Sequence, residues 1–259
     1  MRRGIILVVL TLSVGAIGSA IAQERVDRRQ PASANGVVTI DNVLGSVTVK
    51  GWDRDEVQVT GTLGRRTQEL QVEGSADHTT IHVEIDEDER DVGPTDLVIQ
   101  VPQASRLEIE TVSAKVDISG TDGDIRISTV SGEVVSAAGS RTVAITTVNG
   151  TIRLVTDQAL EDAHFNTVSG KIDVTADLSS KGRLAFETVS GSIFLTLPRR
   201  ISASFDVSTF SGNIQNDFGQ EPVRKDKYLP AKELRFSLGG GDARISMQTL
   251  SGTIHLKAQ

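Results

Sequence analysis

The sequence predicts an all-β protein: a single-domain β-solenoid, similar to a parallel β-helix, of stacked two-strand rungs with Thr-Val-Ser-Gly corners. Three observations predict this class. A short motif recurs along the chain, the segments around it alternate apolar and polar residues, and Val, Ile, Thr, Ser and Gly are plentiful while aromatic residues make up only 3%. Beyond the first apolar stretch, no long amphipathic helical pattern is present.

The motif recurs at nearly constant spacing. From one Thr to the next the intervals are 18, 18, 20, 21, 21 and 40 residues. The small differences indicate loops of varying length between fixed strands, and the last interval indicates an insertion. The copies are Thr111–Ala114, Thr129–Gly132, Thr147–Gly150, Thr167–Gly170, Thr188–Gly191, Thr209–Gly212 and Thr249–Gly252, with a degenerate eighth copy around Gly45.

Each unit is expected to form two short strands joined by a corner. Before the corner Leu107, Ile109 and Thr111 have odd numbers, and after it Val116 and Ile118 have even numbers. A straight strand would place the two sets on opposite faces, so a corner at Ser-Gly is needed for both to point inward. Glycine suits such a corner because it accepts a positive φ. The predicted corner glycines are Gly45, Gly132, Gly150, Gly170, Gly191, Gly212 and Gly252.

A unit of about 20 residues cannot bury its apolar face alone, so the units are expected to stack. Each rung would then advance by the strand spacing of about 4.8 Å. Inward Val, Ile, Leu and Phe would form columns, and the Thr and Ser positions would form hydroxyl ladders. The alternative is an antiparallel sandwich of similar hairpins, but near-identical corners at near-identical spacing favour the solenoid.

We divide the chain into a signal peptide at 1–22, a flexible lead-in at 23–35 and one β-strand-repeat domain at 36–259. Within that domain, 36–105 is an irregular N-terminal part and 106–215 holds the regular repeats. Residues 216–242 are an insertion and 243–259 a closing repeat. Trp52 is expected to cap the end of the solenoid core.

The first residues predict export. Arg2 and Arg3 precede an apolar run from Gly4 to Ile17, and Ala20-Ile21-Ala22 has the small-x-small pattern of a cleavage site, so the mature protein should begin at Gln23. The alternative is a membrane anchor, but the run is shorter than the roughly 20 residues that span a bilayer. We therefore expect a periplasmic, secreted or cell-surface protein with no transmembrane anchor.

Composition excludes several classes of protein. The chain has no Cys, which rules out both disulfides and a lipid-anchored lipoprotein. Its formal net charge is −7, and cleavage would remove two further basic residues. Phosphate backbones would repel such a chain, so nucleic acid is not an expected partner.

The segment from Ile40 to Asp53, Ile-x-Asn-x-x-Gly-x-Val-x-Val-x-Gly-Trp-Asp, and the Thr-Val-Ser-Gly-x-Ile units resemble one bacterial family. It is the exported "putative adhesin" family of β-strand-repeat proteins, a domain of unknown function. The resemblance covers Val37 to Lys257. It implies the repeat architecture and supplies no catalytic residues, because fold analogy does not give function.

No pattern in the chain points strongly to chemistry, so we predict no catalytic residue, no cofactor and no metal. A carbohydrate-active β-helix enzyme is the alternative, for which Glu108 and Glu110 are the best carboxylate pair. His78 and His82 lack a third ligand for a metal. The acidic run Asp86–Asp91 lacks the order of a calcium-binding loop, and Gly239–Gly241 precedes a strand, which does not suit a phosphate site.

We predict a non-enzymatic cell-envelope scaffold or adhesin-like protein with an envelope or extracellular protein or glycan as partner. A self-assembling array, joined end to end, is a further alternative. The candidate partner contact is the insertion, with Arg224, Lys225, Lys227 and Tyr228. The competing interpretation is that Phe218, Leu234, Phe236 and Leu238 form extra strands that cover the open last rungs.

Overall fold

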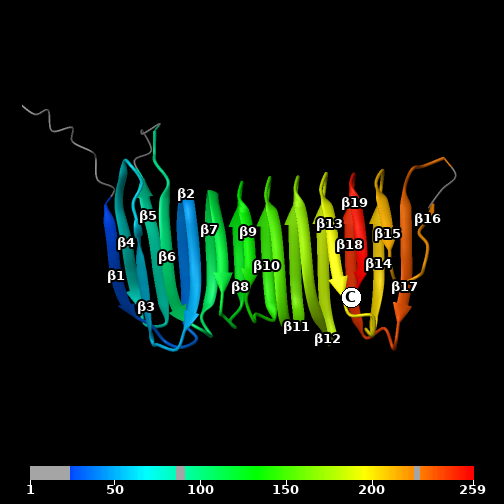
Figure 1. The fold of residues 1–259 in the computed structure, drawn as a ribbon, viewed down its shortest axis with the longest axis horizontal. Helices are drawn as coiled ribbons and strands as arrows, with labels where there is room; N and C mark the ends of the chain where they lie inside the picture. The colour runs from blue at the N-terminus through cyan, green and yellow to red at the C-terminus, as the bar shows by residue number, and fades with distance from the viewer. Residues whose placement is uncertain (1–23, 86–90, 225–227) are drawn as a thin grey trace, which may run out of the picture.

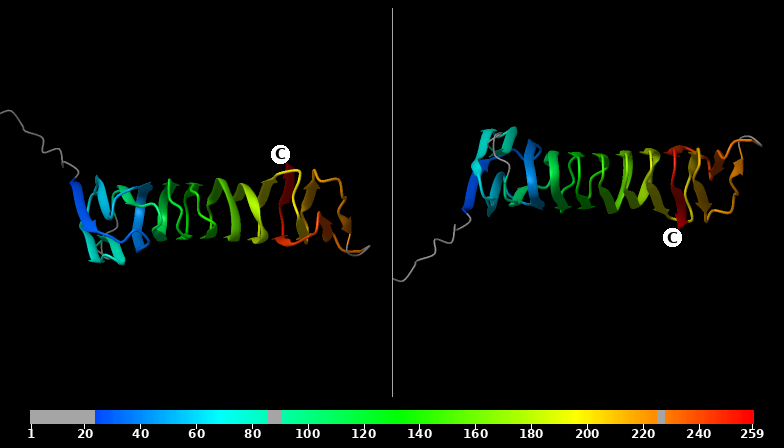
Figure 2. Two further views of the ribbon diagram at one scale, coloured as in Figure 1. Left: turned by 90° about the horizontal axis from the view of Figure 1, so that it is seen from below. Right: turned by 90° about the horizontal axis from the view of Figure 1, so that it is seen from above.

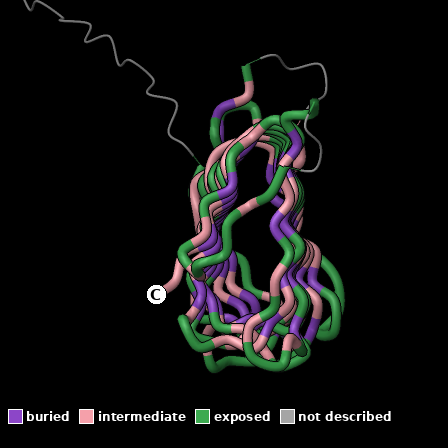
Figure 3. The backbone as a smooth tube through the Cα atoms, turned by 90° about the vertical axis from the view of Figure 1, so that its right-hand side faces the viewer, coloured by how far each residue is buried: buried purple, intermediate pink, exposed green. Residues whose placement is uncertain are grey.

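A computed structural model of the chain describes residues 24–85, 91–224 and 228–259. These residues form 19 β-strands joined by hydrogen bonds, and they include no helix. The predicted all-β class is confirmed. The strands stand side by side along one long axis (Figure 1), and the end-on view shows successive turns of the chain superimposed around a narrow interior (Figure 3). The predicted signal peptide at 1–22 lies outside the described residues.

The strands form two layers (Figure 2), and several long strands cross from one layer to the other. Layer 1 runs β1 (Arg25–Pro31), β3 (Glu56–Thr62), β6 (Thr95–Pro102), the second halves of β2 (Val37–Trp52) and β7 (Arg106–Ser119), β9 (Glu133–Ala137), the first halves of β11 (Thr151–Thr167) and β12 (Lys171–Thr188), β13 (Ser192–Leu197), β19 (Thr253–Ala258) and β15 (Asn213–Asn216). Layer 2 runs β4 (Thr67–Ser75), β5 (His78–Ile85), the first halves of β2 and β7, β8 (Ile125–Thr129), β10 (Thr142–Thr147), the second halves of β11 and β12, β18 (Ala243–Thr249), β14 (Ala203–Thr209), β17 (Lys232–Leu238) and β16 (Val223–Arg224).

Columns of aliphatic side chains fill the space between the layers. Because the central strands pair in parallel and in register, each inward residue lies beside its equivalent on the next strand, about 4.8 Å away. One column of layer 2 contains Leu107, Ile125, Val143, Ala163 and Leu184. One column of layer 1 contains Val116, Val134, Ile152, Ile172 and Ile193. All ten side chains are at most 2% exposed, so the hydrophobic effect acts evenly along the stack.

The unit at 243–259 is the last one in the sequence, but it does not lie at the end of the stack. Strand β18 pairs with β12 on one side and with β14 on the other, and β19 lies in the same way between β13 and β15. The chain therefore leaves a gap of one rung after β13 and fills it with its last two strands. The structural end of the stack is β14, β15 and the insertion.

The insertion covers that end. Strand β17 pairs with β14 in antiparallel fashion, and β16 pairs with β17. Leu234 is 2% exposed, and the ring of Phe236 stacks on that of Phe205 with centroids 4.4 Å apart. The ring of Phe218 also packs against that of Phe205, with centroids 5.8 Å apart. Antiparallel strands thus terminate the parallel stack with apolar side chains turned inward.

The N-terminal end differs from the prediction in two places. The lead-in at 23–35 is not flexible throughout, because Arg25–Pro31 forms β1, pairs with β3 and buries Val26. Trp52 does not cap the core. Its indole Nε1 donates to the carbonyl of Glu56 at 2.8 Å and its ring lies under the guanidinium of Arg54, so it holds the turn between β2 and β3.

The predicted positive φ is wrong for most of the corner glycines. Gly45 has a φ of +117°, and Gly132 and Gly252 also have positive φ, at +159° and +156°, near the extended region. Gly150, Gly170, Gly191 and Gly212 have no positive φ. Glycine is required for another reason. A Cβ atom on Gly170 would lie closer than 3.0 Å to the carbonyl oxygen of Gly150, and Gly191 stands in the same relation to Gly170. At these corner glycines an added Cβ would meet the backbone of the neighbouring corner, although Ala114 occupies the equivalent position at the first regular corner.

Candidate functional site

The apolar residue of each Thr-Φ-Ser-Gly corner is exposed. In the unit at Thr111, the strand buries Leu107, Ile109 and Thr111, so the next residue, Val112, points to solvent. We call the seven equivalent side chains the corner row. In spatial order they are Val112, Val130, Val148, Val168, Val189, Leu250 and Phe210. Their exposed fractions lie between 40% (Val148) and 53% (Leu250), whereas the core columns are almost fully buried.

The corner row is rigidly spaced because the backbone beneath it is hydrogen-bonded from rung to rung. The amide of Ser131 donates to the carbonyl of Val112 at 2.7 Å, and the amide of Asn149 donates to that of Val130 at 2.8 Å. The same bond recurs at every later corner, from the amides of Ser169, Ser190, Ser251 and Ser211, at 2.8 to 2.9 Å. The row is therefore a straight, unbroken line of apolar side chains at strand spacing.

The threonines behind the row support it from the inside. Thr111 donates to Thr129 through their Oγ1 atoms at 2.8 Å, while Thr188 and Thr209 accept the amides of Gly191 and Gly212 at 3.0 and 2.9 Å. These bonds give partners to some of the hydroxyl groups that the corners bury, as buried polar groups require. The buried Oγ1 atoms of Thr147 and Thr249 have no hydrogen-bond partner among the described residues.

At the C-terminal end the corner row forms one wall of a groove of about 770 Å³. Val168, Val189, Leu250 and Phe210 line this wall, and Leu229 and Ala231, between β16 and β17, also line the groove. The corner threonines and Lys232 also line the groove. So do polar residues from the outward column of layer 2: Thr146, Asn166, Glu187, Gln248, Ser208 and Glu233. The volume lies in the range of small-molecule sites, about 300 to 1,000 Å³.

The predicted basic contact is only partly described. Arg224 lies in β16 and is exposed, and Tyr228 is 88% exposed. Lys225 and Lys227 lie outside the described residues, so the structure does not show how the four side chains are arranged. The corner row was not predicted from the sequence, because the apolar residue of the motif resembles a further core residue. Leu107, Ile109 and Thr111 all have odd numbers and point inward, so the even-numbered residue that follows them in the motif should point outward.

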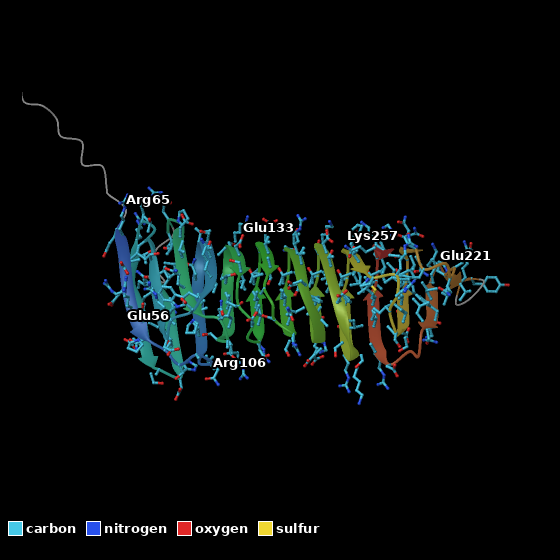
Figure 4. The ribbon with its side chains drawn as sticks, turned by 60° about the horizontal axis from the view of Figure 1, so that its bottom comes forward. Glu56, Arg65, Arg106, Glu133, Glu221 and Lys257 are labelled. Atoms are coloured by element: carbon cyan, nitrogen blue, oxygen red, sulfur yellow. The ribbon has the colours of Figure 1, made fainter. Side chains whose placement is uncertain are left out.

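Charged side chains line the outer faces, and some of them form ion pairs with neighbours. Figure 4 shows Glu133 and Lys257 along one edge of the stack and Glu56 and Arg106 along the other. Glu133 meets Lys115 at 3.3 Å, and Arg106 meets Asp124 at 3.4 Å. About half of each of these side chains is exposed, so such pairs contribute about 0 to 1 kcal/mol each.

Among the residues that the structure describes, no group of side chains is arranged as a catalytic or metal-binding site. Glu108 and Glu110 lie two apart on β7 and point outward, as an ordinary charged strand face does. His82 meets only Asp41, at 3.4 Å, and no group of three or more His, Cys, Asp or Glu in 24–85, 91–224 and 228–259 could hold a metal. Most of Asp86–Asp91 lies outside these ranges; Asp91 itself pairs with Arg65 at 3.7 Å. Gly239–Gly241 joins two strands, β17 and β18.

Over the described part of the chain, no helix is long and apolar enough to cross a membrane.

The solved structures to which the chain is similar are distant in sequence. One from Clostridium sporogenes, described as a "putative cell adhesion protein", is 10% identical, with 91% of this chain and 100% of that chain covered and a TM-score of 0.38. A "putative lipid binding protein" from Parabacteroides distasonis is 14% identical, with 90% and 96% covered and a TM-score of 0.45. A "putative adhesin" from Bacteroides fragilis is 11% identical, with 91% and 98% covered and a TM-score of 0.29.

Among curated proteins, none matches the chain. The structural scores are below 0.5 and carry no argument about function. The family rests on the sequence itself, since one family model matches residues 38–257, nearly the whole described region. The resemblance to a β-strand-repeat family of unknown function is thereby confirmed. The chain belongs to the Toastrack DUF4097 family.

Proposed function

We propose that the chain is a non-enzymatic, exported, adhesin-like scaffold of the cell envelope, and that the corner row is the surface it presents to an envelope or extracellular partner. The observation that carries the proposal is the row itself. Seven half-exposed apolar side chains stand in one line on successive strands. Soluble proteins rarely expose contiguous apolar patches of more than a few hundred Å², and larger ones mark binding sites.

The rest of the molecule suits a scaffold. Hydrogen bonds hold every corner at a fixed distance from the next, and antiparallel strands terminate both layers at the N-terminal end and layer 2 at the other end. A rigid surface loses little conformational entropy when it binds, which favours affinity. The predicted export to the periplasm or cell surface places this surface where envelope components are available.

The N-terminal edge of layer 1 does not favour a self-assembling array joined end to end. Strand β1 carries Arg25, Arg28 and Arg29 and ends in Pro31. Charged residues and proline on an edge strand oppose pairing with another chain. We therefore propose a partner that is not a second copy joined end to end. The basic cluster Arg224, Lys225, Lys227 with Tyr228, which precedes the groove residue Leu229, is proposed as a secondary contact.

The test is capture of envelope components by the mature protein and by two variants. Val168→Ser with Val189→Ser should reduce capture at least tenfold, because both side chains lie in the corner row. The matched control is Val98→Ser with Val155→Ser, since these valines are 38% and 47% exposed but lie elsewhere. Equal capture by both variants would refute the role of the row. Turnover of an envelope polysaccharide would refute the non-enzymatic assignment.

A further inference from the structure

The groove at the C-terminal end of the corner row has the shape of a channel for a linear chain. Its lining residues come from β10, β11, β12, β18, β14 and β17, six adjacent strands. Five strand spacings of about 4.8 Å make it about 24 Å long. Along this length the row contributes valine, then leucine, then phenylalanine, so its apolar surface widens toward the cap.

The backbone of the groove wall is not available to a ligand. The corner amides of Ser169, Ser190, Ser251 and Ser211 already donate to carbonyls of the neighbouring corner. A peptide laid along the row would therefore find no main-chain partners there for its own amides, and leaving such groups unpaired is costly. Its side chains on one face would also repeat at about 6.8 Å, which does not match a row spaced at about 4.8 Å. A polymethylene chain has no polar group to satisfy and no repeat to match.

The charged residues that line the groove indicate which kind of head group the bound chain has. Glu187 is exposed, lines the groove between Asn166 and Gln248, and takes part in no ion pair within the described residues. The charge of Glu233 is paired, because Glu233 meets Arg235 at 3.3 Å. Lys232 donates to the neutral Asn213 at 3.0 Å and keeps its positive charge, but it lies on β17, three strands away from Glu187 on β12. The uncompensated charge on β12 is thus the carboxylate of Glu187, which attracts a cation to that part of the groove.

We infer that the groove binds the alkyl chain of an amphiphile whose head group carries a positive charge, with the chain along Val168, Val189, Leu250 and Phe210 and the head group near Glu187. This inference rests on the proposed function and names the chemistry of the partner. It places the apolar contact on the last four residues of the row and leaves Val112, Val130 and Val148 outside the site.

The experiment is calorimetric titration of the mature protein with alkyltrimethylammonium salts of 8, 10 and 12 carbons, below their micelle concentrations, with circular dichroism to confirm that the fold persists. Burial of a methylene is worth about a factor of four in affinity. We therefore expect the dissociation constant to fall about two- to fourfold per added methylene. Affinity that does not depend on chain length overturns the inference.

Two variants locate the site. Leu250→Ser with Phe210→Ser should weaken binding of the 12-carbon salt at least tenfold, whereas Val112→Ser with Val130→Ser, equally exposed corner residues outside the groove, should not change it. Equal losses in both variants would mean adsorption along the whole row and would contradict the inference. Glu187→Gln should reduce the preference for the ammonium salt over the uncharged dodecyl maltoside severalfold; an unchanged preference would refute the placement of the head group.

A third comparison distinguishes failure of this inference from failure of the proposed function. If the protein captures envelope components through the corner row but binds none of the alkyl probes, the inference fails and the proposed function stands. If a basic apolar peptide displaces the 12-carbon salt and binds more tightly than every alkyl probe, the occupant is a polypeptide and the inference is wrong. If neither envelope components nor probes bind, both fail.

Discussion

Replacement of Gly170 by Ala tests why glycine stands at the corners. The added Cβ would lie closer than 3.0 Å to the carbonyl oxygen of Gly150, whereas ordinary contacts begin at 3.4 Å. The obstacle is backbone and cannot rotate away, so the two rungs have to separate. Overpacking of this kind costs about 1 to 3 kcal/mol. Separation also strains the bond from the amide of Ser169 to the carbonyl of Val148, which is worth about 1 kcal/mol.

We therefore expect a loss of about 3 kcal/mol, which for a domain of this size lowers the melting temperature by about 6 to 12 °C. The measurement is thermal unfolding followed by circular dichroism. The matched control is Gly120→Ala, because Gly120 has a φ of +68° but nothing nearer than 3.5 Å to an added Cβ. Its cost should be about 1 to 2 kcal/mol, from the left-handed backbone alone. If Gly170→Ala melts with the wild type, or is less harmful than Gly120→Ala, the steric explanation is wrong.

Three other outcomes are expected. Leu234→Ala in β17 should cost about 2 to 5 kcal/mol, because its side chain is buried in the C-terminal cap; hydrogen exchange should quicken first in β14, and uniform quickening would contradict a local cap. Val130→Ser should change the free energy of unfolding by no more than about 0.5 kcal/mol in urea, because the side chain is exposed; a larger loss would mean that the corner row is structural. Changing Arg224, Lys225 and Lys227 together to Ser should leave melting unchanged and weaken capture of an envelope partner, most clearly at low salt; capture unaffected at any salt would exclude the cluster as a contact.

The all-β class and the columns follow from local pattern, because the period of an extended strand is two and fixes which side of the chain is apolar. Leu107, Ile109 and Val116 could be assigned to the interior from their spacing alone. The corner row was accessible to the same argument, since Thr111 shares the parity of the core. It was missed because a valine inside a recurring motif resembles a core residue.

The reason for the corner glycines could not be obtained from the sequence. A glycine predicts permissive backbone angles, but at Gly170 the constraint comes from Gly150, 20 residues earlier, which the stack places directly beside it. The pairing of β1 with β3 could not be predicted from the sequence for a similar reason. Arg25–Pro31 is polar and short, and only a neighbouring strand with free hydrogen-bonding groups makes it a strand.

The sequence by itself determined the compositional limits, the repeat, the inward faces and the site of the insertion, because each depends on residues close together in the chain. The tertiary structure alone decided that β18 and β19 enter the stack between earlier rungs, that the exposed corner residues line up as a row, and that the insertion closes a groove beside it. The physical reason is that near-identical units can pair with one another in many orders. Local pattern does not distinguish these orders, and the contacts made across the whole stack, including the cap of Leu234 and Phe236 over the last rung, select one of them.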